Sequence, residues 1–226
     1  MTAAEPLSLT LPDGATVSAL LQVPQDARAL HVFAHGAGAG MHHPGMASVA
    51  DALAGERVAT LRYQFPYMER GSKRVDAPPV AHVAVRAAVA EARRRFPGLP
   101  LFAGGRSFGG RMTSQAQALA PLDGVVGLAF LGFPLHPAGK PGVERARHLA
   151  DVALPMLFLQ GTRDALAELP LLESVLEPLA PRVTLQVIDD ADHSFHVRAS
   201  SGRRDPDVVL EIARALSAWF VAVVDA

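Results

Sequence analysis

The sequence contains no cysteine, which excludes disulfide bonds, thiolate nucleophiles and cysteine metal sites. It also has no run of about 18 consecutive apolar residues, the length at which a membrane-spanning helix is predicted. Residues 1–5 lack the basic patch and the following apolar stretch of a secretory signal. From these absences we expect a cytoplasmic protein.

Charge of either sign is sparse and balanced. Charged residues make up 19% of the chain without forming long runs, and the formal net charge is −1. The sequence therefore has no basic footprint for nucleic acid, and we predict neither a nucleic-acid partner nor a membrane partner. The number of subunits stays open.

Apolar residues, by contrast, make up 50% of the 226 residues, which is enough to bury a substantial core. The 19 glycines and 18 prolines fall between apolar segments, where they indicate turns and not disorder. We predict a single α/β domain over residues 1–226.

Short apolar runs alternate with segments of helical periodicity along the chain. The predicted strands span residues 7–11, 17–23, 30–34, 57–61, 99–104, 124–131, 156–160 and 183–188. The predicted helices span residues 45–54, 80–96, 110–119, 143–150, 166–179 and 206–224, and residues 64–79 form an irregular loop. This alternation predicts a mostly parallel sheet with helices on both faces and a hairpin of the first two strands at one edge. The interval 124–155 is too short for a large lid domain.

Residues 104–110 read Gly-Gly-Arg-Ser-Phe-Gly-Gly and contain a G-x-S-x-G motif centred on Ser107. A predicted strand precedes the motif and a predicted helix follows it, which is the context of a nucleophile elbow. The glycines two positions on either side leave room for a strained turn that lifts the hydroxyl above the sheet, and the helix N-terminus favours developing negative charge. A glycine-flanked serine also arises by chance in loops, but this placement favours a nucleophile.

An acid and a histidine follow Ser107 in the chain order that this arrangement requires. Asp164 comes just after the strand at 156–160, and His193 lies in the polar loop after the last strand. His193 would accept the serine proton, while Asp164 would hold the ring in the right tautomer. The alternatives are that Asp164 caps the helix predicted from residue 166 and that His193 is a surface residue. We predict that the aspartates near the histidine are not the acid; these are Asp189, Asp190 and Asp192.

The glycine-rich loop 35–40 follows the third predicted strand. Such a loop supplies one N–H of an oxyanion hole, and the residue after the nucleophile supplies the other. The predicted donors are the backbone N–H groups of Ala37 and Phe108. The loop lacks the lysine of a phosphate-binding P-loop and does not have G-x-G-x-x-G spacing, so we predict no nucleotide and no other cofactor.

Three histidines near this loop raise the alternative of a metal site: His35, His42 and His43. Adjacent residues on a regular element cannot point both rings the same way, and no further ligands stand at metal-site spacing. We therefore predict no metal, and we assign these histidines to loop packing or to the rim of the site.

Several segments together resemble a compact α/β-hydrolase family related to the dienelactone hydrolases. They are VFAHGAGAGMHHP, AGGRSFGGRMTSQ, LGFPLHPAGKP, LQGTRD and DADHSF, and the similarity covers residues 30–224. The resemblance implies an eight-stranded α/β-hydrolase sheet with a minimal cap, and a triad of Ser107, Asp164 and His193. Dienelactone hydrolases use a cysteine nucleophile that this chain lacks, so their substrate is not carried over.

The sequence thus predicts a serine hydrolase that cleaves a small carboxylic ester through an acyl-serine intermediate. The same residues would serve a thioester, an amide or a peptide. The alternative from a different class is a non-catalytic binding or scaffold protein that keeps the fold, since some relatives are similar to components of larger complexes.

Overall fold

Eight strands form one sheet in the computed structural model, which describes residues 2–226, and their order is β1-β2-β4-β3-β5-β6-β7-β8. The strands are β1 (Glu5–Thr10), β2 (Thr16–Gln22), β3 (Ala29–Ala34), β4 (Val58–Tyr63), β5 (Leu101–Arg106), β6 (Val125–Leu131), β7 (Met156–Gly161) and β8 (Val183–Ile188). All neighbouring strands from β4 to β8 pair in parallel, and only β2 runs against its neighbours. The predicted mostly parallel sheet with a hairpin at one edge is confirmed.

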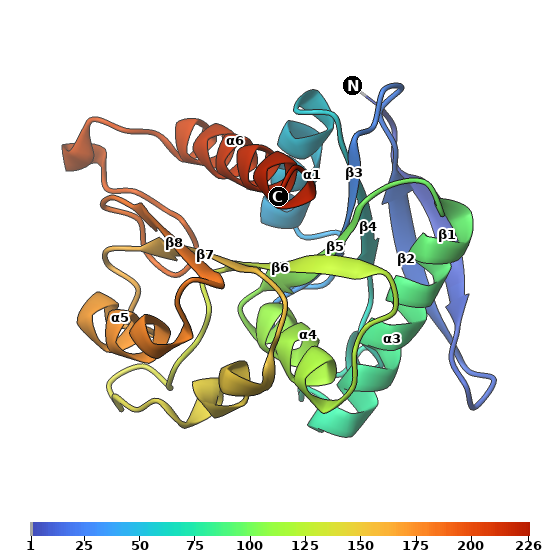
Figure 1. Ribbon diagram of the computed structural model, residues 1–226, viewed down its shortest axis with the longest axis horizontal. Helices are drawn as coiled ribbons and strands as arrows, with labels where there is room; N and C mark the ends of the chain where they lie inside the picture. Colours follow the sequence, from blue (N-terminus) through green and yellow to red (C-terminus); the bar gives the residue numbers. More distant parts are fainter. Residues whose placement is uncertain (1) are drawn as a thin grey trace.

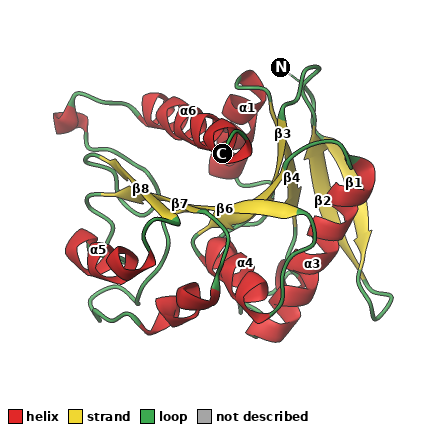
Figure 2. Ribbon diagram, viewed as in Figure 1, coloured by secondary structure: helices red, strands yellow, loops and turns green. Residues whose placement is uncertain are grey.

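Helices cover both faces of this sheet (Figures 1 and 2). The α-helices are α1 (Pro44–Gly55), α2 (Pro66–Glu69), α3 (Pro78–Arg95), α4 (Phe108–Leu119), α5 (Leu169–Leu176) and α6 (Asp205–Val224), and the 3-10 turns are η1 (Glu144–Asp151), η2 (Glu177–Leu179) and η3 (Ala199–Ser201). Helices α1 and α6 pack against one another on one face, while α3 and α4 pack on the other. No helix among residues 2–226 is long and apolar enough to cross a membrane.

The central strands have apolar side chains on both faces because each face is covered by helices. Every residue of β3 is buried. Leu30, Val32 and Ala34 belong to the core under α3 and α4, whereas Ala29 and Phe33 belong to the core under α1 and α6. The alternation along one strand therefore joins two separate cores across the sheet.

Four helical segments differ from the sequence-based expectation. Residues 66–69 form the short helix α2 inside the predicted irregular loop, and α3 begins at Pro78 because proline fits the first turn of a helix. The predicted helix 166–179 was too long: α5 begins at Leu169, with Glu168 as its N-cap, and ends at Leu176. Residues 144–151 form a 3-10 helix and not an α-helix.

The parallel direction of the strands decides where polar loops meet. The carboxyl ends of β3, β5, β7 and β8 lie at one edge of the sheet, so the loops that follow them converge there. Between β6 and β7 the chain forms only a loop and η1, which leaves the cap minimal.

Candidate active site

Ser107 lies at the sharp turn between β5 and α4, as the elbow motif predicts. Its backbone has φ 50° and ψ −116°, in a region that L-residues rarely occupy. Ser107 is also the N-cap of α4, yet its hydroxyl makes no capping hydrogen bond to the helix. The hydroxyl instead lies 2.8 Å from Nε2 of His193. The unusual backbone conformation of Ser107 thus places the hydroxyl toward the histidine and away from the helix.

The two motif glycines allow the neighbouring strand to approach the elbow. A Cβ at Gly109 would lie 2.5 Å from the carbonyl oxygen of His35, and one at Gly105 would collide with the carbonyl of Ala34. Both contacts are with backbone, which cannot move aside. Only glycine at these two positions lets the loop after β3 lie against the nucleophile turn.

Asp164 and His193 come from the loops after β7 and β8 and meet beside Ser107. Oδ2 of Asp164 lies 2.7 Å from Nδ1 of His193. The Asp164 side chain is completely buried, while that of His193 is 23% exposed. The structure therefore brings the three predicted site residues into one chain of hydrogen bonds, with the acid in the interior and the histidine at the surface of the site.

The buried carboxylate of Asp164 has its remaining hydrogen-bonding capacity filled. Its Oδ1 accepts from the backbone N–H of Leu166 at 2.7 Å, and its Oδ2 also accepts from Nε2 of Gln160 at 2.5 Å. These donors compensate the loss of water around a buried charge. The alternative that Asp164 caps a helix is wrong, because α5 starts only at Leu169.

Sequence reasoning missed the role of Gln160. This side chain is fully buried at the end of β7, and its Oε1 accepts from the backbone N–H of Phe133 at 3.0 Å while its Nε2 donates to Asp164. It thus connects the loop after β6 to the carboxylate. A glutamine in an otherwise apolar buried strand was the available signal, since a buried amide requires partners.

Residues 35–40 lie directly beside the elbow. A Cβ at Gly36 would lie 3.7 Å from Cβ of Ser107. The hydroxyl of Tyr67 donates to the carbonyl oxygen of Ala37 at 2.9 Å and lies 3.2 Å from that of Gly36, which fixes the loop from α2. Tyr67 was not singled out from the sequence, because its chain position gives no hint of this contact.

The two predicted oxyanion donors are both free of competing acceptors. The N–H of Ala37 has no acceptor among residues 2–226. Phe108 is the first residue of α4, so its N–H has no acceptor within the helix. Their use as a pair stays a prediction, which rests on the position of loop 35–40 against the elbow.

The chain matches a known protein family over most of its length. Residues 27–221 match the family described as an alpha/beta hydrolase domain. The chain belongs to the α/β-hydrolase family. The expected resemblance is confirmed, and the match includes Ser107, Asp164 and His193.

Solved α/β-hydrolase structures have the same fold over nearly the whole chain. A dienelactone hydrolase from Anabaena variabilis has a TM-score of 0.77 at 22% identity, with 98% of each chain covered. A serine hydrolase without a lid from Xanthomonas campestris has a TM-score of 0.74 at 22% identity, with 97% of this chain and 96% of that one covered. The esterase domain of a Rhodothermus marinus protein has a TM-score of 0.72 at 18% identity, with coverages of 96% and 97%.

This α/β-hydrolase contains a second serine–histidine pair, which differs from the first. Oγ of Ser114 lies 2.7 Å from Nε2 of His148. Ser114 is fully buried within α4, and its hydroxyl donates to the carbonyl oxygen of Arg111. Burial lowers the pKa of His148 to about 4, assisted by the nearby charges of Arg111 and His82. No carboxylate hydrogen-bonds His148 among the described residues, so this pair is suited to packing.

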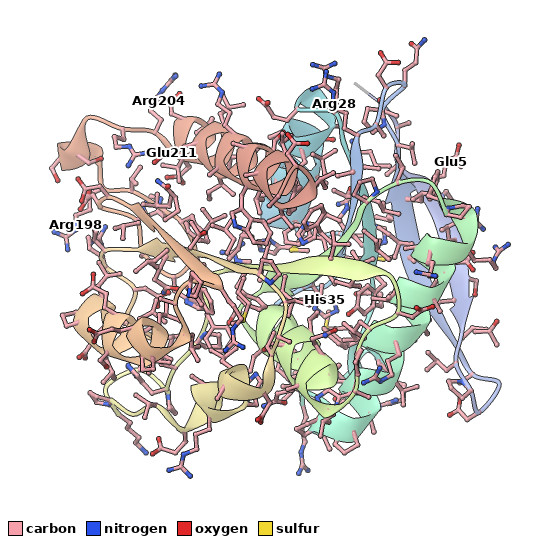
Figure 3. All side chains as sticks on the ribbon, viewed as in Figure 1. Glu5, Arg28, His35, Arg198, Arg204 and Glu211 are labelled. Atoms are coloured by element: carbon pink, nitrogen blue, oxygen red, sulfur yellow. The ribbon has the colours of Figure 1, made fainter. Side chains whose placement is uncertain are left out.

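The histidines near loop 35–40 have structural partners. Nε2 of His35 accepts from the N–H of Phe65 at 3.1 Å, so its Nδ1 carries the proton and donates to the carbonyl of Gly36 at 2.8 Å. Burial lowers the pKa of His35 to about 4, and its ring lies in the interior (Figure 3). Nδ1 of His43 accepts from Gly45 and caps α1. Residues 2–226 contain no group of three or more histidine, aspartate or glutamate side chains arranged to hold a metal ion.

The aspartates close to His193 in sequence point elsewhere. Oδ1 of Asp192 accepts from the backbone N–H groups of Ser194 and His196. Asp190 forms an ion pair with Arg163 at 3.8 Å, and no hydrogen bond connects either aspartate to the His193 ring. The turn that follows β8 thus uses Asp192 to shape its backbone.

Proposed function

We propose that this α/β-hydrolase is a serine hydrolase that cleaves a small carboxylic ester with Ser107, Asp164 and His193. The observation that carries the proposal is the continuous hydrogen-bonded chain from Ser107 Oγ through His193 to a fully buried Asp164. A serine, an imidazole and a carboxylate in this order are the arrangement that activates a serine nucleophile.

The acylation half-reaction follows from the roles of these groups. Nε2 of His193 accepts the hydroxyl proton of Ser107 as the oxygen attacks the ester carbonyl carbon. Asp164 accepts the hydrogen bond from Nδ1 and stabilises the imidazolium that forms. His193 then gives its proton to the leaving alkoxide, and the carbon–oxygen bond of the ester breaks to leave an acyl-serine.

Deacylation repeats the sequence with water. His193 removes a proton from a water molecule, whose oxygen attacks the acyl carbon, and the proton then returns to Ser107 as the acid leaves. In both halves the carbonyl oxygen becomes negative, and the N–H groups of Ala37 and Phe108 are the proposed donors to it. The first turn of α4 contains no acidic residue that would oppose this charge.

The short connection between β6 and β7 supports a small ester over a large lipid. The chain forms no lid between β6 and β7, and lid-covered apolar surfaces are typical of enzymes that act at oil interfaces. The same machinery would serve a thioester or an amide, since the attacked carbon is a carbonyl in each case. A small soluble molecule is the expected partner.

A fluorophosphonate probe tests the proposal most directly. It should label the wild-type protein on Ser107, and the purified protein should release p-nitrophenol from p-nitrophenyl acetate or butyrate. A protein that neither reacts with the probe nor hydrolyses any p-nitrophenyl ester would instead be a scaffold that keeps the fold. The hydrogen-bonded set of three residues argues against a scaffold, because a binding protein has no need of it.

A further inference from the structure

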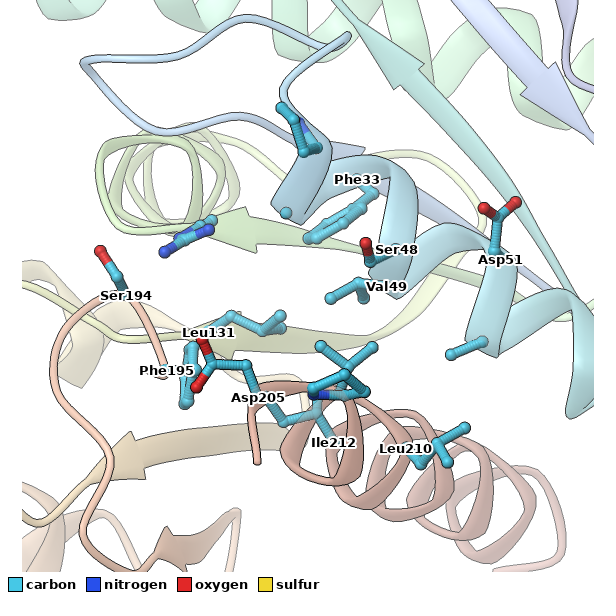
Figure 4. A pocket seen from close by; sticks show the side chains of 16 residues that line it. Phe33, Ser48, Val49, Asp51, Leu131, Ser194, Phe195, Asp205, Leu210 and Ile212 are labelled. Atoms are coloured by element: carbon cyan, nitrogen blue, oxygen red, sulfur yellow. The ribbon is translucent and has the colours of Figure 1, made fainter. Parts of the chain in front are cut away.

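A cavity of about 600 Å³ lies beside the proposed active site, between α1, α6 and the end of the sheet (Figure 4). Most of its wall is apolar, with side chains from both helices and from the strand ends: Phe33, Val49, Leu131, Phe195, Val209 and Ile212. Its wall also contains Arg106 and Ser194, the chain neighbours of Ser107 and His193. Ser107 and His193 do not line the cavity themselves, so it approaches the proposed proton transfer through their chain neighbours.

Arg106 is a cation without a partner in this mostly apolar wall. Its guanidinium forms no ion pair and no side-chain hydrogen bond among residues 2–226, although the residue is only partly exposed. Burial lowers the pKa of Arg106, while the negative charge of Asp192 acts in the opposite direction and raises it. The Asp192 carboxylate is itself engaged by two backbone N–H groups of its own loop. Removing an unpaired guanidinium even partly from water costs free energy, and an anion that pairs with it would offset that cost.

The helix next to Arg106 adds to the positive potential. A Cβ on Gly45 would lie 2.9 Å from a terminal guanidinium nitrogen of Arg106, which places the cation against the first turn of α1. That turn contains no acidic residue, and Nδ1 of His43 caps it by accepting from the backbone N–H of Gly45. A helix N-terminus carries partial positive charge, so α1 and Arg106 favour the same kind of ligand group.

Two acids also line the cavity, and both have partners. Asp51 accepts from Nε2 of Gln22 at 2.8 Å, and Figure 4 places it at the opposite end of the cavity from Ser194. Asp205 pairs with Nδ1 of His196 at 2.8 Å and accepts from the N–H of Val197. Arg106 is therefore the cation of the cavity that a bound anion would complete.

We infer that this cavity selects substrates that carry a carboxylate on a short apolar body, and that Arg106 is the residue that recognises the carboxylate. The inference rests on the proposed function, since it names the substrate class of the same site. The apolar body packs between α1 and α6, the carboxylate pairs with Arg106 through two parallel hydrogen bonds, and the ester carbonyl lies at Ser107. Arg106 is a specificity residue and takes no part in proton transfer.

Binding tests the inference without requiring turnover. In the Ser107→Ala protein, isothermal calorimetry should show that γ-phenylbutyrate binds about 10- to 100-fold more tightly than the neutral γ-phenylbutyramide. Adding Arg106→Gln should remove this preference. Adding Arg111→Gln instead should keep it, because Arg111 lies one turn after Ser107 in the same segment but does not line the cavity. Equal binding of acid and amide, or a preference that is lost with Arg111 and not with Arg106, overturns the inference.

Turnover separates the inference from the proposed function. The matched substrates are p-nitrophenyl butyrate and p-nitrophenyl hydrogen succinate, in which a carboxylate replaces the terminal methyl. The ratio of kcat/KM for the succinate to that for the butyrate should fall about 10- to 100-fold in Arg106→Gln. Hydrolysis of butyrate with an unchanged ratio overturns the inference alone. Carboxylate binding to the Ser107→Ala protein with no hydrolysis of any ester by the wild type overturns the proposed function alone.

Discussion

The side-chain amide of Gln160 donates to the same Oδ2 atom of Asp164 that lies against the His193 ring, at 2.5 Å and 2.7 Å respectively. One carboxylate oxygen thus accepts from both a fixed amide and the imidazole. The amide holds the carboxylate in place, and it also draws electron density away from the bond to His193. Gln160 is therefore a positioning residue for the proposed triad.

We expect Gln160→Leu to lower kcat by about 10- to 100-fold, because a misplaced triad member loses alignment with the reacting groups. The loss should fall on kcat and not on KM, because the alignment of the reacting groups is disturbed. Gln117→Leu is the matched control, since that buried glutamine accepts from Leu122 far along α4 and should leave kcat in place. Equal losses of kcat in the two variants would contradict the role of Gln160.

Ser107→Ala should abolish hydrolysis, with a loss on the order of 10⁶ in kcat, as for removal of a nucleophile in a serine protease. Ser114→Ala is the control, because Ser114 also touches a histidine but is fully buried within α4. It should retain activity and probe labelling once folding is verified by circular dichroism. If Ser107→Ala kept more than about a tenth of wild-type activity, Ser107 would not be the nucleophile.

Asp164→Asn should lower kcat by roughly 10⁴, because an amide stabilises the wrong tautomer of His193. The control is Asp192→Asn, which alters a carboxylate that bonds only to its own turn. We expect a much smaller loss there. Steady-state kinetics on p-nitrophenyl butyrate measure both, and a larger loss in Asp192→Asn would show that the acid has been misassigned.

His31 should make the folded state sensitive to acid. Its ring is fully buried and stacks on Phe33 at 5.2 Å between centroids, and burial lowers its pKa from 6.5 to about 3. Between these values the unfolded chain binds a proton that the folded protein excludes, so the free energy of unfolding falls as pH drops below 6.5. The expected slope is about 1.4 kcal/mol per pH unit.

His31→Phe tests this contribution. Urea denaturation at pH 7 and pH 5 should show a free-energy loss that is about 2 kcal/mol smaller in the variant than in the wild type. Other buried histidines, such as His35 and His148, leave a residual acid sensitivity in both proteins because burial lowers their pKa values too. Equal losses in the two proteins would show that His31 is not kept neutral by the fold.

Acyl-chain length should discriminate against long substrates. Each methylene of a long acyl chain contributes about 0.8 kcal/mol to binding only if an apolar surface of the protein buries it. Between β6 and β7 the chain forms only a loop and η1, so no lid from that segment covers a long chain. The value of kcat/KM for p-nitrophenyl esters should therefore stop rising before octanoyl. A steady climb to palmitoyl with activation at an emulsion surface would contradict this expectation.

Local features of the sequence determined much of the architecture. Alternating apolar runs and helical periodicity predicted the eight strands and the order of the elements, because strand and helix periods differ along the chain itself. The G-x-S-x-G spacing predicted a sharp turn at Ser107, because a motif of five consecutive residues is visible in the chain itself. Chain order after the elbow was also sufficient to select Asp164 and His193 for the site.

Contacts between distant segments were decided only by the tertiary structure. Gln160 and Tyr67 carry no local motif: Gln160 bonds to Phe133, 27 residues earlier, and Tyr67 bonds to Ala37, 30 residues earlier. Arg106 lies inside the elbow motif, but only the packed fold shows that it lines a cavity. The beginning of the helix predicted at 166–179 was misplaced for a related reason: residues up to Glu168 lie outside the helix, where Asp164 accepts from the backbone N–H of Leu166. Whether a buried polar side chain finds a partner depends on which loops the sheet brings to one edge, and that is a property of the packed fold.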